Sequence, residues 1–459
     1  MTSQPASRRA LASLSLSMLM PSLDTSIANV ALPSIAQAFG LSFSQVLWIV
    51  LANLLALTSI IVSAGRIGDT IGRKRLLLFG IGLFTSASLL SGFAPTFGFL
   101  VAARAMQGIG AAILLALVMS LAGTSALGLL GALSAIGTSL GPPIGGAIIA
   151  AFGWRMIFFV NLPLGLLTAA LAYRYLPIDE TERTAAKPSF DVIGAVLLAL
   201  TLAAYVLAMT MNRQGLTLLN AALFMAAAGA LALLVRVESR KDSPLIPLCI
   251  FRNPSRSAGL AMSTLVSTVL MATLVVGPFY LSRGLGLPPA QVGLAMSIGP
   301  LVAALAGLSA GAIIDRLGVQ RMTRFGLIGM AGGLTLLSIL PLNFGVPGYI
   351  TPIALVTASY ALFQTANNTT VMTGVAASRR GVLSGMLTLS RNLGLITGAA
   401  VMGALFAYAS GAIGNAPTPP PDVARGMRVT FAAGLALIAA ALAVAAKASS
   451  ASTATATAS

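Results

Sequence analysis

The sequence contains no histidine and only one cysteine, Cys249, in 459 residues. The lack of histidine excludes a histidine proton relay and a histidine-based metal site, and a single cysteine excludes an intramolecular disulfide. The chain also lacks a phosphate-binding loop, a metal-ligand cluster and a nucleophile–base pair. We therefore expect no enzyme activity, no bound metal and no cofactor.

Charged residues are also scarce, at 8% of the chain, whereas 57% of the residues are hydrophobic. Apolar runs of about 20 residues cross a bilayer as helices, and these runs do not show the alternation of a β-barrel strand. We predict an all-α integral membrane protein with 14 spans, near residues 11–31, 43–64, 76–93, 97–120, 126–151, 156–175, 190–211, 215–237, 256–281, 289–313, 323–341, 348–371, 381–409 and 427–446.

The net charge of +17 admits two interpretations, a nucleic-acid partner or a membrane topology signal. With both termini in the cytoplasm, most of the 27 lysines and arginines fall on the inner side, and only Arg104 and Arg391 lie within spans. This asymmetry follows the positive-inside rule. We therefore predict a multi-pass protein of the cell (inner or plasma) membrane with both termini cytoplasmic. We expect the lipid bilayer as its partner, no nucleic acid, and a monomer.

The first apolar segment carries one acid, Asp24. Its start, SRRALASLSLSMLM, resembles a signal peptide or a twin-arginine leader, but no clear A-x-A cleavage site follows, so we interpret it as the first span. A charge in hydrocarbon costs about 2.5–3.5 kcal/mol or more. Since no other Asp or Glu lies in the interior of a predicted span, Asp24 is the first functional candidate.

Two loops repeat one another. GRIGDTIGRKR (65–75) follows the second span and GAIIDRLGVQR (311–321) follows the tenth. Internal repeats are typical of secondary transporters, whose substrate site lies between the two halves. We predict a six-helix bundle in residues 1–175, two inserted helices with flanking cytoplasmic linkers in 176–245, a second six-helix bundle in 246–447 and a disordered tail in 448–459.

The loop pattern G-x-x-x-D-x-x-G-R-K-R resembles the signature loop of the major facilitator superfamily. In that family such a loop is expected to latch one conformation of a two-state carrier; the alternative is a loop that only sets topology. The candidate gating residues are Gly65, Asp69, Gly72, Arg73, Lys74 and Arg75 in the first copy and Asp315, Gly318 and Arg321 in the second.

The fourth predicted span contains LVAARAMQGIGAA (100–112), which resembles the superfamily's R-x-x-Q-G motif. Its Arg104 and Gln107 share one helix face. Arg104 and Asp24 each lie seven residues from the outer end of their spans, about 10 Å deep. If the two helices are neighbours, Arg104 can pair with Asp24; the alternative is that Arg104 snorkels to the outer interface.

The fifth predicted span contains GTSLGPPIGGAI (137–148), which resembles the motif that marks antiporters within the superfamily. Glycines let helices approach closely, and prolines bend them. Ordinary small-residue packing is the alternative. The motif residues are Gly137, Gly141, Pro142, Gly145 and Gly146.

Two further segments, LDTSIANVALP (23–33) and WRMIFFVNLPLG (154–165), resemble motifs of the 14-span drug:proton antiporters. Ser26 stands where a threonine is usual. The resemblance implies a major facilitator fold with two six-helix bundles and two inserted helices. It also implies a proton-coupled antiporter that exports amphipathic, cationic small molecules, with Asp24 as the proton carrier and Arg104, Gln107 and Asn29 in the same site.

Polar residues also occur in later spans: Gln364, Asn367 and Asn368 in the twelfth and Arg391 in the thirteenth. They either line a cavity or bond helices together. Two other functions stay open. One is proton-coupled export of a single metabolite or antibiotic. The other is a membrane sensor or scaffold without transport, against which the two copies of the gating loop argue.

Overall fold

The computed structural model describes residues 8–121, 123–176, 192–210, 217–240, 250–251, 253–375, 377–412 and 418–457, which form helices and turns without a strand. The chain divides into two compact units. Unit 1 comprises residues 1–39 and 48–245, and unit 2 comprises residues 40–47 and 246–459. The linkers expected at 177–191 and 241–249 lie outside the described residues.

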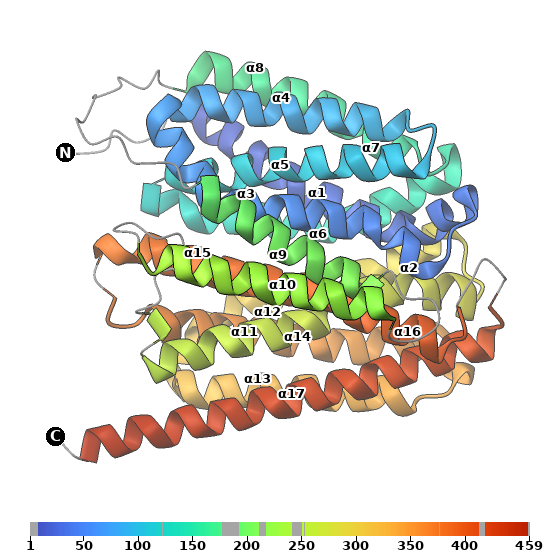
Figure 1. Ribbon diagram of the computed structural model, residues 1–459. Helices are drawn as coiled ribbons and strands as arrows, with labels where there is room; N and C mark the ends of the chain where they lie inside the picture. The colour runs from blue at the N-terminus through green and yellow to red at the C-terminus, as the bar shows by residue number, and fades with distance from the viewer. Residues whose placement is uncertain are drawn as a thin grey trace. The chain divides into compact units, whose positions relative to one another are not determined.

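Unit 1 contains the first six predicted spans and both inserted helices (Figure 1). Its helices are α1 (Arg8–Phe39), α3 (Trp48–Ile71), α4 (Arg73–Gly92), α5 (Phe97–Leu121), α6 (Gly123–Phe152), α7 (Met156–Phe159), α8 (Asn161–Tyr175), α9 (Val192–Thr210) and α10 (Leu218–Glu238). The inserted pair α9–α10 packs together, and α9 contacts α3. The two inserted helices thus belong to the unit that precedes them in the chain.

Unit 2 contains the last six predicted spans and one short helix from the N-terminal part of the chain. Its elements are α2 (Phe43–Val46), α11 (Pro254–Phe279), η2 (Tyr280–Gly284), α12 (Pro289–Leu317), α13 (Val319–Ile339), η3 (Leu342–Phe344), α14 (Gly345–Met372), α15 (Ala377–Thr397), η4 (Gly398–Met402), α16 (Gly403–Ala409) and α17 (Pro420–Thr457). A capping box of Ser42 and Gln45 begins α2, and Phe43 packs against Phe279 and Phe406, with ring centroids 4.6 and 4.7 Å away. The predicted span 43–64 is therefore divided between α2 and α3.

The all-α membrane fold predicted from hydropathy is confirmed. Among the described residues, 13 helical stretches are long and apolar enough to cross a bilayer. The helix α1 is not one of them, because Asp24 and several serines lower its apolar character. At the other end, α17 continues to Thr457, beyond residue 447, where the sequence suggested that the last span ends and a disordered tail begins.

Two glycines turn the chain at equivalent places in the two units. Gly72 separates α3 from α4 with φ 104°, and Gly318 separates α12 from α13 with φ 80°. A side chain is strained at these positive φ values, whereas glycine is not. The repeated loop thus has the same backbone device in both copies.

The interior of unit 1 lies where α1, α3, α4 and α5 meet. Apolar side chains from these helices form one buried cluster, which includes Leu14, Ile81, Leu114 and Leu117. The contacts of α5 with both α3 and α4 hold it at the centre of the unit. This packing fixes the position of the polar residues that α5 carries.

Candidate functional site

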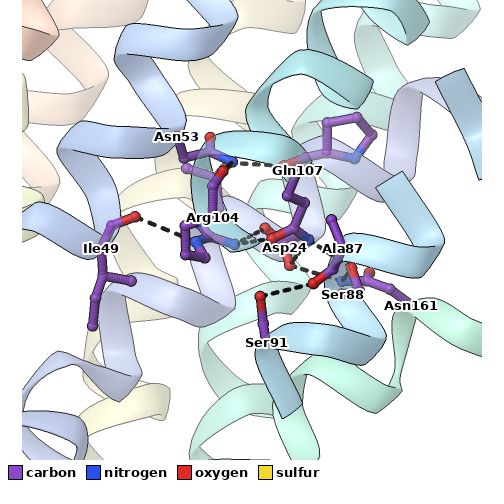
Figure 2. Close-up of polar contacts among 11 residues, drawn as sticks. Asp24, Ile49, Asn53, Ala87, Ser88, Ser91, Arg104, Gln107 and Asn161 are labelled. Atoms are coloured by element: carbon purple, nitrogen blue, oxygen red, sulfur yellow. Dashed lines mark hydrogen bonds and ion pairs between the residues drawn. The ribbon is translucent and has the colours of Figure 1, made fainter. Parts of the chain in front are cut away.

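Asp24 of α1 lies in a buried network of polar side chains from four helices (Figure 2). Arg104 Nη1 donates to Asp24 Oδ2 at 2.6 Å, and Gln107 Nε2 donates to Oδ1 at 2.8 Å. Asn161, the first residue of α8, donates from Nδ2 to the same Oδ1 at 2.7 Å. The pairing of Asp24 with Arg104 that equal depth suggested is therefore present, and Asp24 is only 4% exposed.

Ser88 of α4 is the fifth residue of the network and contacts Gln107 and Asn161 rather than Asp24. Its Oγ accepts from Gln107 Nε2 at 2.7 Å and from Asn161 Nδ2 at 3.1 Å. Gly165, one turn after Asn161, allows α8 to lie directly against Thr85 of α4. This close approach brings the start of α8 to Ser88.

Sequence reasoning gave no role to Ser88 or to Asn161. Asn161 appeared only as one match within the motif of the sixth predicted span, although an amide in an apolar segment is itself a signal of a polar contact. Ser88 gave no such signal, because a serine in a helix can bond to its own backbone. Only the packing of α8 against α1 and α4 shows that Asn161 and Ser88 belong to this network.

Arg104 is held by more than its ion pair. Its Nη1 also donates to Gln107 Oε1 at 2.5 Å, its Nε donates to the Ile49 carbonyl at 3.3 Å, and its guanidinium lies 5.7 Å from the Phe158 ring centroid. The side chain is 1% exposed. Such a charge is stable in a protein interior only while its counter-charge and hydrogen bonds are present. Arg104 thus does not snorkel to the interface.

The network has a definite polarity. Every group that contacts the two oxygens of Asp24 in the described part of the chain is a donor, namely Arg104, Gln107 and Asn161. A carboxylate accepts these bonds, but a protonated carboxyl group carries an O–H that would face a donor. All three contacts are therefore of the kind that an ionised carboxylate accepts.

The glycine motif of α6 sets the position of α1. A methyl group at Gly141 would meet the Ser26 side chain, and one at Gly145 would lie 3.0 Å from Ile27 Cγ2. Gly137 likewise faces the α1 backbone, and Pro142 and Gly146 are buried beside it. The small residues let α6 lie directly against the helix that carries Asp24.

A hydrogen bond between the same helices depends on the proline. Pro142 has no N–H, so it leaves the carbonyl of Thr138, four residues earlier, without its helical donor. Ser26 Oγ donates to that carbonyl at 2.9 Å. The proline of the motif thus creates an acceptor on α6, and α1 supplies the donor.

Asn29 stands apart from this network. It is 2% exposed, and none of its side-chain hydrogen bonds within the described residues reaches Asp24. Its Oδ1 has no hydrogen-bond partner there. The structure thus brings together Asp24, Arg104 and Gln107 of the expected site and leaves out Asn29.

The first copy of the gating loop connects α4 with two other helix ends. Arg73 bonds to Asp69 at 2.9 Å and donates to the Ser120 carbonyl of α5 at 3.4 Å. Lys74 donates to the carbonyl of Leu176, which follows α8, at 2.6 Å. The Asp69–Arg73 pair is about half exposed, so the contacts to Ser120 and Leu176 carry the connection. The structure gives Gly65 open space on α3 and describes no such contact for Arg75.

The second copy lacks this ion pair. Val319 stands in α13 where Arg73 stands in α4, so Asp315 has no cation four residues later. Asp315 and Arg321 are exposed, and neither forms a salt bridge in the part of the chain that the structure describes. The two copies share the turn at Gly72 and Gly318 but differ in their side-chain contacts.

The polar residues of the later spans separate into two groups. Asn367 is buried and donates to the Gly259 carbonyl of α11 at 3.0 Å, so it bonds two helices. Gln364 is half-buried, whereas Asn368 and Arg391 are exposed. The sequence left open whether these residues line a cavity or join helices, and the structure shows that Asn367 joins helices.

A second buried acid, Glu238, lies at the end of α10 with 2% exposure. The sequence placed it just outside the eighth span, at 215–237.

Within the described residues, no three Cys, Asp or Glu side chains come together as metal ligands would.

Comparison with known proteins shows similarity to membrane transporters over most of the chain. The family model described as "Major Facilitator Superfamily" matches residues 14–399. The chain is 30% identical to the riboflavin transporter RibZ of Clostridioides difficile (strain 630), over 85% of this chain and 86% of that protein. It is 32% identical to the multidrug resistance protein Stp of Mycobacterium tuberculosis (strain ATCC 25618 / H37Rv), over 85% of this chain and 74% of that protein. Among solved structures, the nucleoside transporter NupG has the same fold, with a TM-score of 0.68 and 14% identity over 95% of this chain and 98% of that one.

Proposed function

Because the chain belongs to the major facilitator superfamily, we propose that it is a proton-coupled antiporter that exports amphipathic small molecules. The chain is a membrane transporter rather than an enzyme, and its similarity to multidrug efflux proteins supports a role in drug efflux. In the proposed mechanism Asp24 carries the exchanged proton.

The donors around Asp24 are the observation that carries this proposal. Ionised Asp24 joins α1 to α5 through Arg104 and Gln107 and to α8 through Asn161. A proton on Asp24 cancels the charge that Arg104 pairs with and places an O–H against a donor. Proton binding therefore favours another arrangement of α1, and a two-state carrier uses such a preference to couple proton movement to alternating access.

The charge balance limits the stoichiometry. Among the described acids, Asp24 is the only one that lies more than one turn from a helix end, so we propose one proton per transport cycle through a membrane carboxylate. Exchange of one proton for a monovalent cation is then electroneutral. We predict that amphipathic monovalent cations are exported better than divalent ones, because the described residues place no second acid at that depth to pair with a second charge.

Uptake into everted vesicles tests the proposal, because an exporter moves its substrate into the lumen of an inside-out vesicle. Ethidium, a monovalent lipophilic cation, is added outside vesicles that contain the wild-type chain, Asp24→Asn or Asp422→Asn, with and without a protonophore. Asp422 is an acid of α17 that pairs with Arg425 and serves as the control. We expect protonophore-sensitive transport by the wild type and the control and none by Asp24→Asn. Full proton-driven transport by Asp24→Asn would disprove the role of this carboxylate.

Export of one specific metabolite is the second candidate. The 30% identity to a riboflavin transporter favours it, since that relative is matched over nearly the same length as the multidrug protein. The two candidates differ in breadth. Transport of riboflavin but not of ethidium in the same vesicles would support the narrow function.

A further inference from the structure

Arg391 lies at a depth where an unpaired charge needs an explanation. The apolar stretch Val382–Ala409 runs through α15, η4 and α16, and Arg391 is nine residues from its start. At 1.5 Å per residue this is about 14 Å, close to half of a hydrocarbon core of about 30 Å. An ionisable side chain at this depth is costly and is by default a functional candidate.

One side of α15 is fixed against α11. Ser390 donates to the Leu260 carbonyl at 2.6 Å and bonds to Thr264, and Gly394 lies directly against the Thr264 backbone. Arg391 points away from this contact: it is exposed and forms no salt bridge or hydrogen bond within the described residues. The charge is thus neither neutralised nor buried by the described part of unit 2.

Arg391 belongs to a polar stripe. Ser384 and Thr388 precede it at helical spacing, and the three residues are exposed, half-buried and exposed respectively. Residues at i, i+4 and i+7 lie on one helix face. The face of α15 that carries Ser384, Thr388 and Arg391 is therefore polar to mid-membrane, which is unsuited to lipid contact.

The neighbouring helix α14 carries a matching stripe. Tyr360, Gln364 and Asn368 follow one another at four-residue intervals and are half-buried or exposed. The helices α14 and α15 contact each other, and Tyr360 lies within electrostatic range of the Arg391 guanidinium. Tyr360 and Arg391 lie 12 and 14 residues from the facing ends of α14 and α15, so the two stripes reach a similar depth.

The two stripes carry a positive charge but no negative one. Neither α14 nor α15 contains an Asp or Glu, so these two helices give Arg391 no acid to pair with, and it forms no salt bridge within the described residues. The next residue, Asn392, is 5% exposed, and its Nδ2 has no partner within the described residues, which leaves a second donor near this depth without an acceptor. A planar guanidinium with nearby phenol and amide groups suits a carboxylate, sulfonate or phosphate.

We propose that Arg391, with Tyr360 and Gln364, binds an anionic group of the exported amphipathic molecule. The inference rests on the proposed export function and names the charge of its substrate. It adds an anion site in unit 2 to the cationic preference expected from Asp24. The inferred site favours compounds that carry a negative group, so the best substrates are zwitterionic or anionic amphipaths rather than simple cations.

A pair of dyes tests this proposal. Rhodamine 110 and rhodamine 123 share one xanthene ring system and differ in a carboxylate that is free in the first and a methyl ester in the second. Binding to the purified full chain in phosphatidylcholine nanodiscs is measured by fluorescence polarisation. We expect the wild type to bind rhodamine 110 at least about tenfold more tightly, since a hydrogen bond to a charged group contributes about that factor or more.

Variants then identify the side chain. We expect Arg391→Gln to weaken rhodamine 110 binding about tenfold and to leave rhodamine 123 within about twofold, with Arg391→Lys in between. Arg425→Gln, which removes an exposed charge elsewhere in unit 2, serves as the matched control and should keep the wild-type preference. Equal binding of both dyes by the wild type, or an Arg391→Gln variant with unchanged preference, would overturn the proposal.

Two further arms separate this proposal from its alternatives. If Arg391 binds a lipid phosphate instead, phosphatidylglycerol nanodiscs should abolish the preference for rhodamine 110, which would also count against a substrate site. Asp24→Asn should keep the dye preference although it stops proton-driven efflux. Loss of proton coupling with the preference intact would contradict only the proposed antiport, and loss of the preference with intact efflux would contradict only the anion site.

Discussion

The ion pair of Asp24 and Arg104 gives a stability prediction with a definite size. Asp24→Asn keeps the shape of the side chain and removes its charge, which leaves Arg104 buried at 1% exposure without a counter-charge. Breaking a buried pair in this way costs about 3–5 kcal/mol. The new amide adds to the cost in either orientation, since its NH₂ group faces Arg104 in one and Gln107 and Asn161 in the other.

The double variant Asp24→Asn/Arg104→Gln isolates the interaction. It removes both charges at once, so no uncompensated ion remains in the interior. We expect it to be less destabilised than the sum of the two single variants by about 1–3 kcal/mol, the range measured for residues in one polar network. An additive double variant would show that the two side chains are not energetically coupled.

Tryptophan fluorescence is a suitable probe, because both tryptophans of the chain, Trp48 and Trp154, lie in unit 1. We expect each single variant to lower the melting temperature in detergent by about 6–20 °C, at 2–4 °C per kcal/mol. Asp422→Asn, which removes an exposed acid of unit 2, should leave the transition unchanged. A shift below about 2 °C in Asp24→Asn would refute the assigned cost of the unpaired arginine.

The α6 contact gives two further predictions, and substrate breadth gives a third. Gly141→Ala should cost about 1–3 kcal/mol in the same fluorescence assay, because its methyl group meets Ser26, whereas Gly131→Ala on the same helix has open space and should cost nothing. Ser26→Ala should cost about 1–3 kcal/mol by leaving the Thr138 carbonyl without a donor, and adding Pro142→Ala should recover part of that loss by restoring an N–H; a further loss in the double variant would contradict this explanation. In everted vesicles we expect the wild type to transport ethidium, and transport of riboflavin but not of ethidium would favour the specific metabolite.

Much of the fold follows from the sequence because a membrane allows few alternatives. Outside a closed β-barrel, an apolar run of about 20 residues can satisfy its backbone hydrogen bonds in lipid only as a helix. Hydropathy therefore predicts where the spans lie. The pairing of Asp24 with Arg104 could also be predicted from the sequence, because two opposite charges at equal depth in an apolar medium stabilise one another. Depth along a helix can be counted from the sequence.

Contacts between helices were harder to predict from the sequence, because the spacing of residues along one helix does not show which neighbouring helix a given face contacts. Asn161 and Ser88 bond to the same network as Asp24 from helices far away in the chain. Glu238 is buried at a helix end that hydropathy places at the interface. The open, polar face around Arg391 depends on which side of α15 packs on α11, and only the Ser390 contacts show this.

The two units share one repeated fold but carry different ionisable residues. Both have the glycine turn, at Gly72 and Gly318, but only unit 1 has a described acid more than one turn from a helix end, and Arg391 of unit 2 is an exposed arginine in mid-span. If Asp24 carries the proton and Arg391 holds the substrate anion, the two ligands do not compete for one side chain. Coupling must then arise from the conformation that each ligand favours. Arg391→Gln should accordingly change which compounds are transported and keep their protonophore sensitivity, whereas Asp24→Asn should abolish that sensitivity and keep the preference for rhodamine 110 over rhodamine 123.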